Sequence, residues 1–557
     1  MLTDGIAGLE GAGHDLCVVG SGPVGLALAT DLARRGQRVL LLESGGETAD
    51  TRIQSLASAD IVDPSRHDDM MIATARRLGG TSHLWGARCL PFDPIDFELR
   101  DWVPATWPIS YEDIAPYWSA AVQATQSGAP VYRAALDGID LADDRFDATA
   151  LERWANKQQA QNVHAEAIAR DPKLDVRLHA TVVGMEFALD GRVTHIEVAH
   201  SLSGERVRLP VGTLVIAAGG LEGARLLLAA RRDAPQRFGG EDGPLGRYYM
   251  GHVVGEIADI TFANEASDGA FGYHVDAHGS YVRRRIVPSP ALQREQRLLN
   301  TALWPLVPPV ADARHKSAIL SLVYLAMRWP IIGRRIVAEA IRTQHAPLPR
   351  PPIVPHLVNL IAGAPAAALF AADFMRRRHD KQTRLPGFFV RNKARRYGLA
   401  YHAEQLPRPE SRVSLQPGAD RLGLPRLVID YRVHADDAAS VVRTHDLLED
   451  WLAATGFARL DYRVARQDRA QSVLDQSGHG VHQIGLTRMG ANAREGVVDS
   501  NLCCFGAPNL HVAGTGVLPT SGQANPTLTA VALALRLSEH LSTEAARPLR
   551  IAKAATT

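Results

Sequence analysis

Apolar and turn-forming segments alternate along the first fifty residues in the order strand, turn, helix, strand. Residues 15–19 form an apolar run that leads directly into a glycine-rich turn. Residues 26–35 have the spacing of an amphipathic helix, and residues 37–43 form a second apolar run. This pattern predicts a βαβ unit at the start of the chain.

The turn between these segments has the spacing G-x-G-x-x-G. Gly20 permits the tight turn, Gly22 lets the backbone approach a pyrophosphate, and Gly25 lets the helix pack close to the strand. The helix N-terminus supplies N–H groups and partial positive charge for phosphates. Glu43 ends the second apolar run and is suited to bind a ribose hydroxyl. The unit predicts a bound dinucleotide, but it does not by itself separate FAD from NAD.

Further strand patterns occur in the middle and at the end of the chain. Residues 176–187 and 193–200, joined through an Asp-Gly pair, predict a hairpin. Residues 213–220 predict a buried strand that ends in small residues and is followed by a helix. Residues 509–516 predict another buried strand, and Pro526 suits the first turn of a helix just after it.

Composition narrows the class of protein. A chain of 557 residues is too long for one simple core, so we expect two closely packed domains. A formal net charge of +1 gives no indication of a nucleic-acid partner. The four cysteines are too few for a disulfide framework, and they have no CxxC spacing for a zinc or iron–sulfur site. The N-terminus lacks the pattern of a secretory signal, and we therefore expect a cytoplasmic protein.

Two motifs extend the interpretation to a family. They are R-L-G-G-T-S-H-L-W-G at residues 77–86 and an H-x-x-G-x-x-R-M-G block that begins at His482. With these motifs the chain resembles the glucose–methanol–choline (GMC) oxidoreductases, especially the branch near pyranose oxidase and the bacterial sugar, polyol and glycoside dehydrogenases. The resemblance covers most of the chain apart from residues 300–395. It implies an α/β fold with a discontinuous Rossmann-type FAD-binding domain and an antiparallel-sheet substrate domain.

The resemblance also implies a division of the chain and a set of FAD-binding residues. The FAD-binding domain is expected in three parts, 1–130, 176–255 and 491–545, with a helical connection at 131–175, a substrate domain at 256–490 that carries an apolar insertion at about 300–395, and a tail at 546–557. The residues expected at FAD are Gly20, Gly22, Gly25, Glu43, Gly79, Gly80, Thr81, Ser82, Trp85, Val183, Ala218, Gly219, Gly514, Thr515, Asn525, Pro526 and Thr527.

The flavin-facing loop departs from the pyranose oxidases at one position. In those relatives a histidine directly before the tryptophan carries a covalent bond to the flavin. Here Leu84 occupies that position and His83 comes one residue earlier. Adjacent residues usually point in different directions, so we expect non-covalent FAD and a polar, substrate-side role for His83.

The reacting pair is expected to be His482 and Asn525. Histidine suits the removal of a hydroxyl proton because its unperturbed pKa lies near 6.5. The resemblance places His482 at flavin N5 and makes Asn525 its partner, which can donate its amide to the substrate oxygen. The alternatives are a core role for His482, a helix cap at Asn525, and His479 as the base. Gln405 is a candidate substrate contact or an ordinary polar residue of the sheet.

The leading function is FAD-dependent oxidation of a secondary hydroxyl of a sugar or glycoside to a ketone, by hydride transfer to flavin N5. Two alternatives stay open: oxidation of a lipid, sterol or other amphiphilic alcohol at a membrane surface, and an inactive flavin-binding adaptor. The sequence does not separate oxygen, a quinone and a redox protein as electron acceptor.

The insertion at about 300–395 has the strongest shift in composition. Residues 316–327 and 331–343 read as helices, and residues 354–375 are nearly continuously apolar and end in three arginines. Prolines and polar residues interrupt the last stretch, which disfavours a spanning helix although its length approaches one. Peripheral membrane contact, a buried lid and a homo-oligomer interface remain alternatives for this segment.

Overall fold

The two apolar runs predicted at the N-terminus lie at the centre of a six-stranded parallel sheet. The computed structural model describes the whole chain except residues 12, 137–142, 330–350, 381, 479 and 547–557. β2 (Leu16–Val19) and β3 (Val39–Leu42) pair in parallel, and every residue of both strands is buried. The strand order is β1-β8-β3-β2-β12-β22, and the remaining strands are β1 (Leu2–Asp4), β8 (Leu174–Leu178), β12 (Thr213–Ile216) and β22 (Leu510–Val512).

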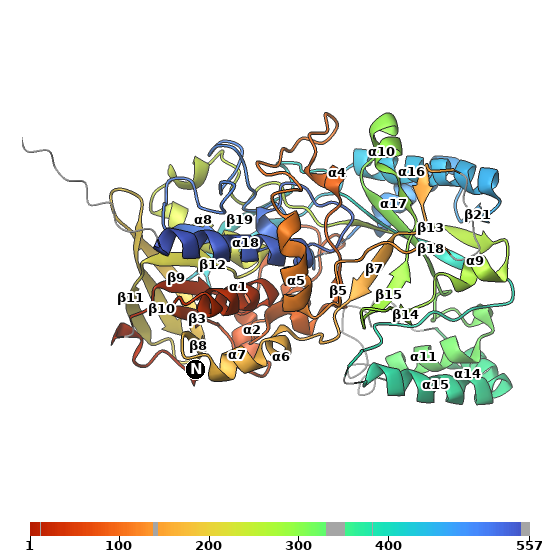
Figure 1. Cartoon of the computed structure of the whole chain (residues 1–557), viewed down its shortest axis with the longest axis horizontal. Coiled ribbons are helices and arrows are strands. Elements are labelled where there is room, and N and C mark those ends of the chain that lie inside the picture. Colours follow the sequence, from red (N-terminus) through yellow and green to blue (C-terminus); the bar gives the residue numbers. More distant parts are fainter. Residues whose placement is uncertain (12, 137–142, 330–350, 381, 479, 547–557) are drawn as a thin grey trace, which may run out of the picture.

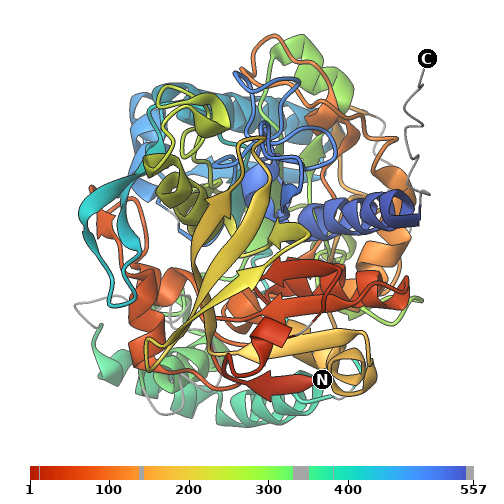
Figure 2. The same cartoon turned by 90° about the vertical axis from the view of Figure 1, so that its left-hand side faces the viewer.

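Helices from both ends of the chain cover this sheet. α1 (Pro23–Arg34) connects β2 to β3 and packs against α18 (Thr527–Ala546), which in turn packs against α5 (Trp118–Thr125) (Figure 1). α8 (Gly220–Arg232) follows β12. Figure 2 shows these red-to-yellow strands side by side, with α18 in blue beside them. The parallel sheet is thus assembled from the N-terminal, middle and C-terminal parts of the chain.

The segment 176–187, predicted as one strand, is divided between two sheets. β8 belongs to the parallel sheet, whereas β9 (Ala180–Phe187) pairs with β10 (Val193–His200) in an antiparallel sheet that β11 (Arg206–Pro210) completes. His179 separates the two strands and has a φ of 53°, in the left-handed region, so the chain turns there. The hairpin is confirmed, but the prediction of a single strand was wrong.

A four-stranded antiparallel sheet forms the second half of the molecule. Its order is β17-β18-β13-β21, with β17 (Thr301–Leu306), β18 (Arg396–Ala403), β13 (Val253–Phe262) and β21 (Ala458–Tyr462). α16 (Ala435–Thr455) and α17 (Arg469–Gln476) pack against this sheet. Trp451 of α16 is fully buried in their common core. A smaller sheet, β14-β15-β7-β5, lies between the halves in Figure 1, with β14 (His274–Val275), β15 (Tyr281–Arg284), β7 (Leu151–Trp154) and β5 (Arg88–Cys89).

Three helices form a separate layer below the antiparallel sheet in Figure 1, which we call the helical layer: α11 (Ala318–Arg328), α14 (Ile353–Ala362) and α15 (Ala364–Arg378). The apolar stretch predicted at 354–375 is therefore two helices, bent by 91° between Ala362 and Ala364. Among the described residues, no single helix is long and apolar enough to cross a membrane, although the bent pair passes by length and composition. The helix expected at 331–343 lies outside the described residues.

Candidate functional site

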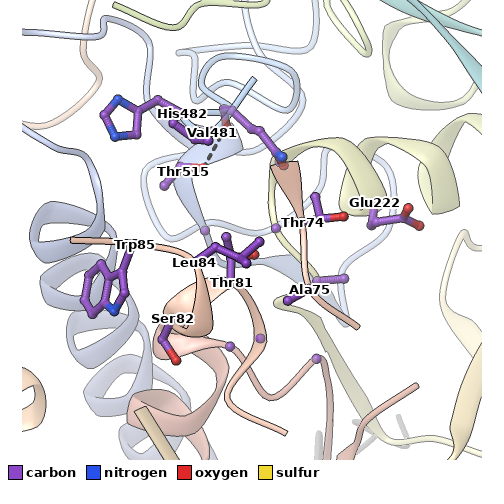
Figure 3. A pocket seen from close by; sticks show the side chains of 18 of the residues that line it. Thr74, Ala75, Thr81, Ser82, Leu84, Trp85, Glu222, Val481, His482 and Thr515 are labelled. Carbon is purple, nitrogen blue, oxygen red and sulfur yellow. Dashed lines mark hydrogen bonds between the residues drawn. The ribbon is translucent and has the colours of Figure 1, made fainter. Parts of the chain in front are cut away.

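A cavity of about 880 Å³ runs from the parallel sheet to the antiparallel sheet. At one end it is lined by the residues that follow β2, β3 and β12, which is the edge where dinucleotides bind in open α/β sheets. At the other end it is lined by Arg88, His402, His482 and Asn525. We call these the dinucleotide end and the reaction end. Figure 3 shows Thr81, Leu84 and Trp85 on the lower side of this cavity and His482 and Thr515 above them.

Close backbone approaches build the dinucleotide end. A Cβ on Gly25 would lie 1.9 Å from the carbonyl oxygen of Gly20, so α1 can meet the strand only if this residue is glycine. Gly20 has a φ of +102°, and a Cβ there would lie 2.7 Å from the Ala217 carbonyl oxygen. At Gly22, in contrast, a Cβ would meet no protein atom within 4 Å. Since Gly22 lines the cavity, that open space suits an approaching pyrophosphate.

Glu43 faces the same end of the cavity from the end of β3. It is buried, and its Oε2 accepts hydrogen bonds from the amide and hydroxyl of Ser21, at 3.0 and 2.6 Å. Its Oε1 accepts from the amide of Gly45 at 2.8 Å. These donors hold the carboxylate in place beside the glycine turn, where it fits a ribose hydroxyl.

The second glycine loop packs directly on the first. A Cβ on Gly80 would lie 2.8 Å from the Cα of Gly22, so the 3-10 turn η3 (Gly80–His83) closes over the dinucleotide end. Leu84 and Trp85 line the cavity, and the indole N–H of Trp85 donates to the Gln158 carbonyl at 2.6 Å. His83 is held elsewhere: its Nε2 lies 2.9 Å from the carbonyl oxygen of Leu78, outside the lining residues. The structure therefore places the Leu84 side chain, and not the imidazole, at the cavity.

Most of the residues expected at FAD line this one cavity: Gly20, Gly22, Glu43, Gly80, Thr81, Ser82, Trp85, Ala218, Gly219, Gly514, Thr515, Asn525 and Thr527. The others do not line it: Gly25, Gly79, Val183 and Pro526. Val183 packs instead in an apolar cluster with Ile53 and Leu56, and the preceding Val182 lines the cavity. The two differ because successive residues of a strand point to opposite faces.

Gln405, a candidate substrate contact, is buried and bonded to protein at both ends of its amide. Its Oε1 accepts from the amide of Gly251 and from the hydroxyl of Tyr431, both at 2.8 Å. Its Nε2 donates to the carbonyl of Arg432 at 2.6 Å. Gln405 thus joins three chain segments behind the cavity, as the alternative of an ordinary polar sheet residue expects.

The structure brings His482 and Asn525 together at the reaction end. The Nε2 of His482 lies 3.1 Å from the amide nitrogen Nδ2 of Asn525. Asn525 lies two residues before the start of α18, and His482 lies in the loop after α17. Met250 and Ile484 form an antiparallel bridge in that loop. Counting two residues outward from this bridge places His252 opposite His482, and their Nδ1 atoms lie 2.8 Å apart.

Hydrogen-bond partners define the proton positions in this group. Arg88 can only donate, and its Nε donates to the Oδ1 of Asn525, so the Asn525 NH₂ must face His482. The His482 Nε2 then accepts from that NH₂, which leaves the His482 proton on Nδ1, directed at the Nδ1 of His252. His252 in turn donates from Nε2 to the Ser521 carbonyl at 3.2 Å. One consistent arrangement results: His482 is neutral and its basic lone pair is on Nε2.

A buried ion-pair network supports Arg88 from behind. Arg88 donates to Glu152 at 2.9 Å, and Arg283, opposite Glu152 in the β7–β15 pairing, donates to the same carboxylate at 2.6 Å. Burial by itself raises the pKa of Glu152, but Arg283 and Arg88 outweigh it and hold the pKa below its usual value. Two arginines share one carboxylate here, so the network leaves positive charge beside Asn525.

A third histidine, His402 of β18, stacks on His252 with ring centroids 4.1 Å apart. Burial and the neighbouring His252 and Arg88 hold the pKa of His402 well below its usual range, so it is neutral. His252, His402 and His482 have the residue types of a metal site. However, two ligands of one tetrahedral zinc lie about 3.3 Å apart, and the 2.8 Å between the Nδ1 atoms of His252 and His482 is a hydrogen-bond distance. The geometry favours a hydrogen-bonded relay over a metal centre.

Four residues of the reaction end carry no motif in the sequence: Arg88, Glu152, His252 and His402. No spacing in the sequence relates His252 to His482. Arg88 and Glu152 are single charged residues in short strands, without any spacing signal. Arginine and glutamate are rarely fully buried unless they are paired, but the sequence alone does not show which of these residues are buried.

Comparison with known proteins agrees with this geometry. Residues 15–286 match the family model described as FAD dependent oxidoreductase, and residues 407–534 match the model described as GMC oxidoreductase. The 2-methyl-1,2-propanediol dehydrogenase of Mycolicibacterium austroafricanum is 23% identical over 95% of this chain and 95% of its own. The C-glycoside 3-oxidase of Microbacterium trichothecenolyticum is 32% identical over 22% of this chain and 23% of its own. Among solved structures, pyridoxine 4-oxidase from Mesorbium loti has a TM-score of 0.55 and 16% identity, covering 95% of this chain and 99% of that one.

The fold and the cavity define an FAD-dependent oxidoreductase. More particularly, the chain combines its FAD-dependent oxidoreductase domain with the C-terminal domain of the GMC oxidoreductases, as the resemblance in its motifs predicts. FAD is the cofactor. The glycine cradle, the carboxylate of Glu43 and the cavity volume of about 880 Å³ fit this cofactor.

Proposed function

We propose that this enzyme oxidises a secondary hydroxyl of a sugar or glycoside to a ketone. The observation that carries the proposal is the contact between His482 Nε2 and Asn525 Nδ2, at the end of the cavity opposite the phosphate-binding turn. Oxidation of an alcohol needs a base for the hydroxyl proton and a donor for the oxygen, and these two groups supply both. The relative named as a C-glycoside 3-oxidase supports the carbohydrate preference.

The residues act on the substrate oxygen. Bound FAD supplies the hydride acceptor. The unprotonated Nε2 of His482 takes the hydroxyl proton, while the Asn525 NH₂ donates to the same oxygen as negative charge develops on it. Arg88 holds the amide in the donating orientation, and its positive charge, shared through Glu152 with Arg283, stabilises that oxygen electrostatically. Because Leu84 occupies the cavity wall and His83 is bonded to Leu78, we propose that FAD is held without a covalent bond.

A second candidate substrate is an amphiphilic alcohol such as a lipid or sterol. The helical layer favours it, because α14 exposes an apolar face. A chain of contacts also connects the helical layer to the reaction end. Arg378 at the end of α15 donates to the carbonyls of Leu385 and Pro386, and the following Gly387 lies against the hydroxyl of Tyr273. The ring of Tyr273 in turn lies 5.1 Å from the guanidinium of Arg283, which donates to Glu152 beside Arg88.

An anaerobic titration tests these proposals. The flavin absorbance of the purified enzyme is followed after mixing with sugars and glycosides, with sterols and fatty alcohols, and with buffer alone. Bleaching by the carbohydrates supports the leading function, and bleaching by the apolar alcohols alone supports the second. Flavin that no alcohol bleaches would favour an inactive adaptor. Admitting air afterwards shows whether oxygen reoxidises the flavin or whether a quinone or redox protein is needed.

His482→Ala is the decisive variant. We expect it to retain FAD and to slow flavin reduction at least about a hundredfold, the scale of a general base. His278→Ala is the matched control, since His278 is exposed and lies outside the lining, and it should reduce its flavin at the wild-type rate. Unchanged reduction in His482→Ala contradicts the assignment.

We also propose that the enzyme works in the cytoplasm, at or near the inner face of the membrane. All four cysteines are free, including the neighbours Cys503 and Cys504, as suits a reducing compartment. Fractionation of cells into periplasmic, cytoplasmic and membrane pools tests this; recovery in the periplasmic pool contradicts it.

A further inference from the structure

α14 has its polar and apolar faces reversed relative to a helix on a water-facing surface. His356 is fully buried, with ring nitrogens 3.2 Å from the hydroxyl of Ser321 and 3.2 Å from the carbonyl of Ala311. Asn359 donates to the Ala313 carbonyl at 2.8 Å on the same inner side. Surface helices in water normally turn their apolar stripe inward and their polar side outward. Here the polar side chains tie α14 to the rest of the helical layer.

The apolar side chains face outward. Val354, Val358 and Ile361 have exposed fractions of 68, 61 and 78%. Their spacing of four and three residues places them on one face of the helix. Leu357, three residues after Val354, is exposed on the same face, and we call these four side chains the apolar face. Leu369 on α15 is also exposed, by 74%. Contiguous exposed apolar side chains of this kind mark interaction or membrane surfaces.

The segment of the sequence that carries the apolar face is strongly basic. Residues 311–395 contain 15 lysines and arginines and four acidic residues, a formal charge of +11, although the formal net charge of the chain is +1. The rest of the chain is therefore net negative. Arg376 and Arg377 are exposed at the end of α15, where both also pair with Asp373. Exposed apolar side chains in a basic segment complement an anionic lipid surface.

We propose that the apolar face docks on an anionic lipid bilayer, with α14 and α15 lying along the surface. The 91° bend separates the two helices, and the ten residues of α14 are too few to cross a bilayer. A second copy of the chain is a poorer occupant. In a two-fold dimer the same patch meets itself, so two regions of formal charge +11 would be brought together.

Vesicle co-sedimentation with the FAD-loaded enzyme tests docking. The probes are vesicles of phosphatidylcholine alone and of phosphatidylcholine mixed with phosphatidylglycerol, at low and high salt. We expect binding to the mixed vesicles, at least about tenfold weaker binding to phosphatidylcholine alone, and weakening by salt. Absence of binding to the mixed vesicles at low salt overturns the proposal.

Two variants separate the apolar and the charged contributions. Val358→Glu combined with Ile361→Glu should weaken binding at least about tenfold. Arg376→Gln combined with Arg377→Gln, which leaves the apolar face intact, should weaken it about fivefold for each arginine removed. Leu189→Glu is the matched control, since Leu189 is an exposed leucine in the β9–β10 turn, and it should bind like wild type. Each variant is first checked for wild-type flavin content and flavin reduction.

Two outcomes would reassign the apolar face. Equal binding by wild type and the glutamate variant would show that other residues contact the lipid. A concentration-dependent dimer in light scattering, dissociated by the glutamate variant, would assign the face to a second copy of the chain. Because vesicle binding is measured without substrate, failure here leaves the proposed oxidation untouched.

Discussion

The two ends of the cavity are built in opposite ways. The dinucleotide end is made by backbone: Gly20, Gly22 and Gly25 lie within six residues, the close approaches at Gly20 and Gly25 leave no room for a side chain, and Gly22 leaves open space toward the cavity. The reaction end is made by side chains from distant segments, and Arg88 and Asn525, which are hydrogen-bonded, lie 437 residues apart. The dinucleotide end therefore requires room for close backbone contacts, whereas the reaction end requires hydrogen bonds that point in the right direction.

The same difference is seen in the electrostatics. The dinucleotide end offers amides, the start of α1 and the carboxylate of Glu43. The reaction end contains the buried charges of Arg88, Arg283 and Glu152, which fix the orientation of a neutral amide and a neutral imidazole. Substitutions at the first end should thus affect FAD binding, and substitutions at the second should affect the rate while FAD stays bound.

The largest effect is expected from Gly25→Ala. The added Cβ would lie 1.9 Å from the Gly20 carbonyl oxygen, so the turn cannot keep its position. We expect purified protein with almost no flavin, measured as the ratio of flavin to protein absorbance. Gly418→Ala is the control, because a Cβ there meets nothing within 4 Å, and it should keep its FAD. Full flavin content in Gly25→Ala would show that backbone approach does not determine the dinucleotide end.

Arg88→Met tests the reaction end. Without the donor to Oδ1, the Asn525 amide can rotate and present its oxygen to His482, which removes the donor for the substrate oxygen. Misorientation of one reacting group costs up to about a hundredfold. We therefore expect flavin content to stay at the wild-type level and the limiting rate of flavin reduction to fall about ten- to a hundredfold. Arg88→Lys keeps the charge but not the fork of donors, so a partial recovery measures the charge alone. Loss of FAD in Arg88→Met would contradict the separation of the two ends.

His252→Leu should have a smaller effect of the same kind. His252 accepts the Nδ1 proton of His482 and so keeps the basic lone pair on Nε2. Without it, the proton can move to Nε2, and we expect reduction to slow about tenfold, which corresponds to about 1.4 kcal/mol in the barrier. The pH profile of reduction should shift as well. His252→Asn retains an acceptor near that position and should recover most of the rate. If His252→Leu and His252→Asn reduce their flavin at the same rate, His252 has no role in orienting His482.

The contrast between the ends also explains what the sequence could predict. The βαβ unit, the hairpin and the C-terminal strand and helix are confirmed, because each depends on local periodicity and on glycine spacing. His482 and Asn525 were chosen from a resemblance, and the structure places them 3.1 Å apart. Arg88, Glu152 and His252 were missed because their meaning lies in contacts between distant segments. For the apolar stretch at 354–375, hydrophobic composition alone predicts neither the bend between the two helices nor which side of α14 faces outward.

A buried histidine of the cavity lining, His67, should make the stability of the fold sensitive to acid. His67 lines the cavity, its Nδ1 lies 2.7 Å from the Asp68 carbonyl and its Nε2 lies 2.8 Å from the Tyr249 hydroxyl. Burial lowers the pKa of His67 to about 4, against 6.5 for an unperturbed histidine. Between these values the unfolded chain binds a proton that the folded chain does not, so falling pH favours unfolding. The stabilisation is complete above about pH 6.5 and is lost as pH falls to about 4.

His67→Gln keeps a polar side chain but removes this titration. A shift of this size corresponds to about 3 kcal/mol, so the melting temperature of the variant should fall less steeply than that of wild type from about pH 6.5 to about pH 4. Buried His164 and His445, each with a pKa lowered to about 4, keep part of the slope in both proteins. Parallel curves would mean that His67 is already hydrated and charged in the fold. The cavity lining at His67 would then be open to water, and water would have to be considered at both ends of the cavity.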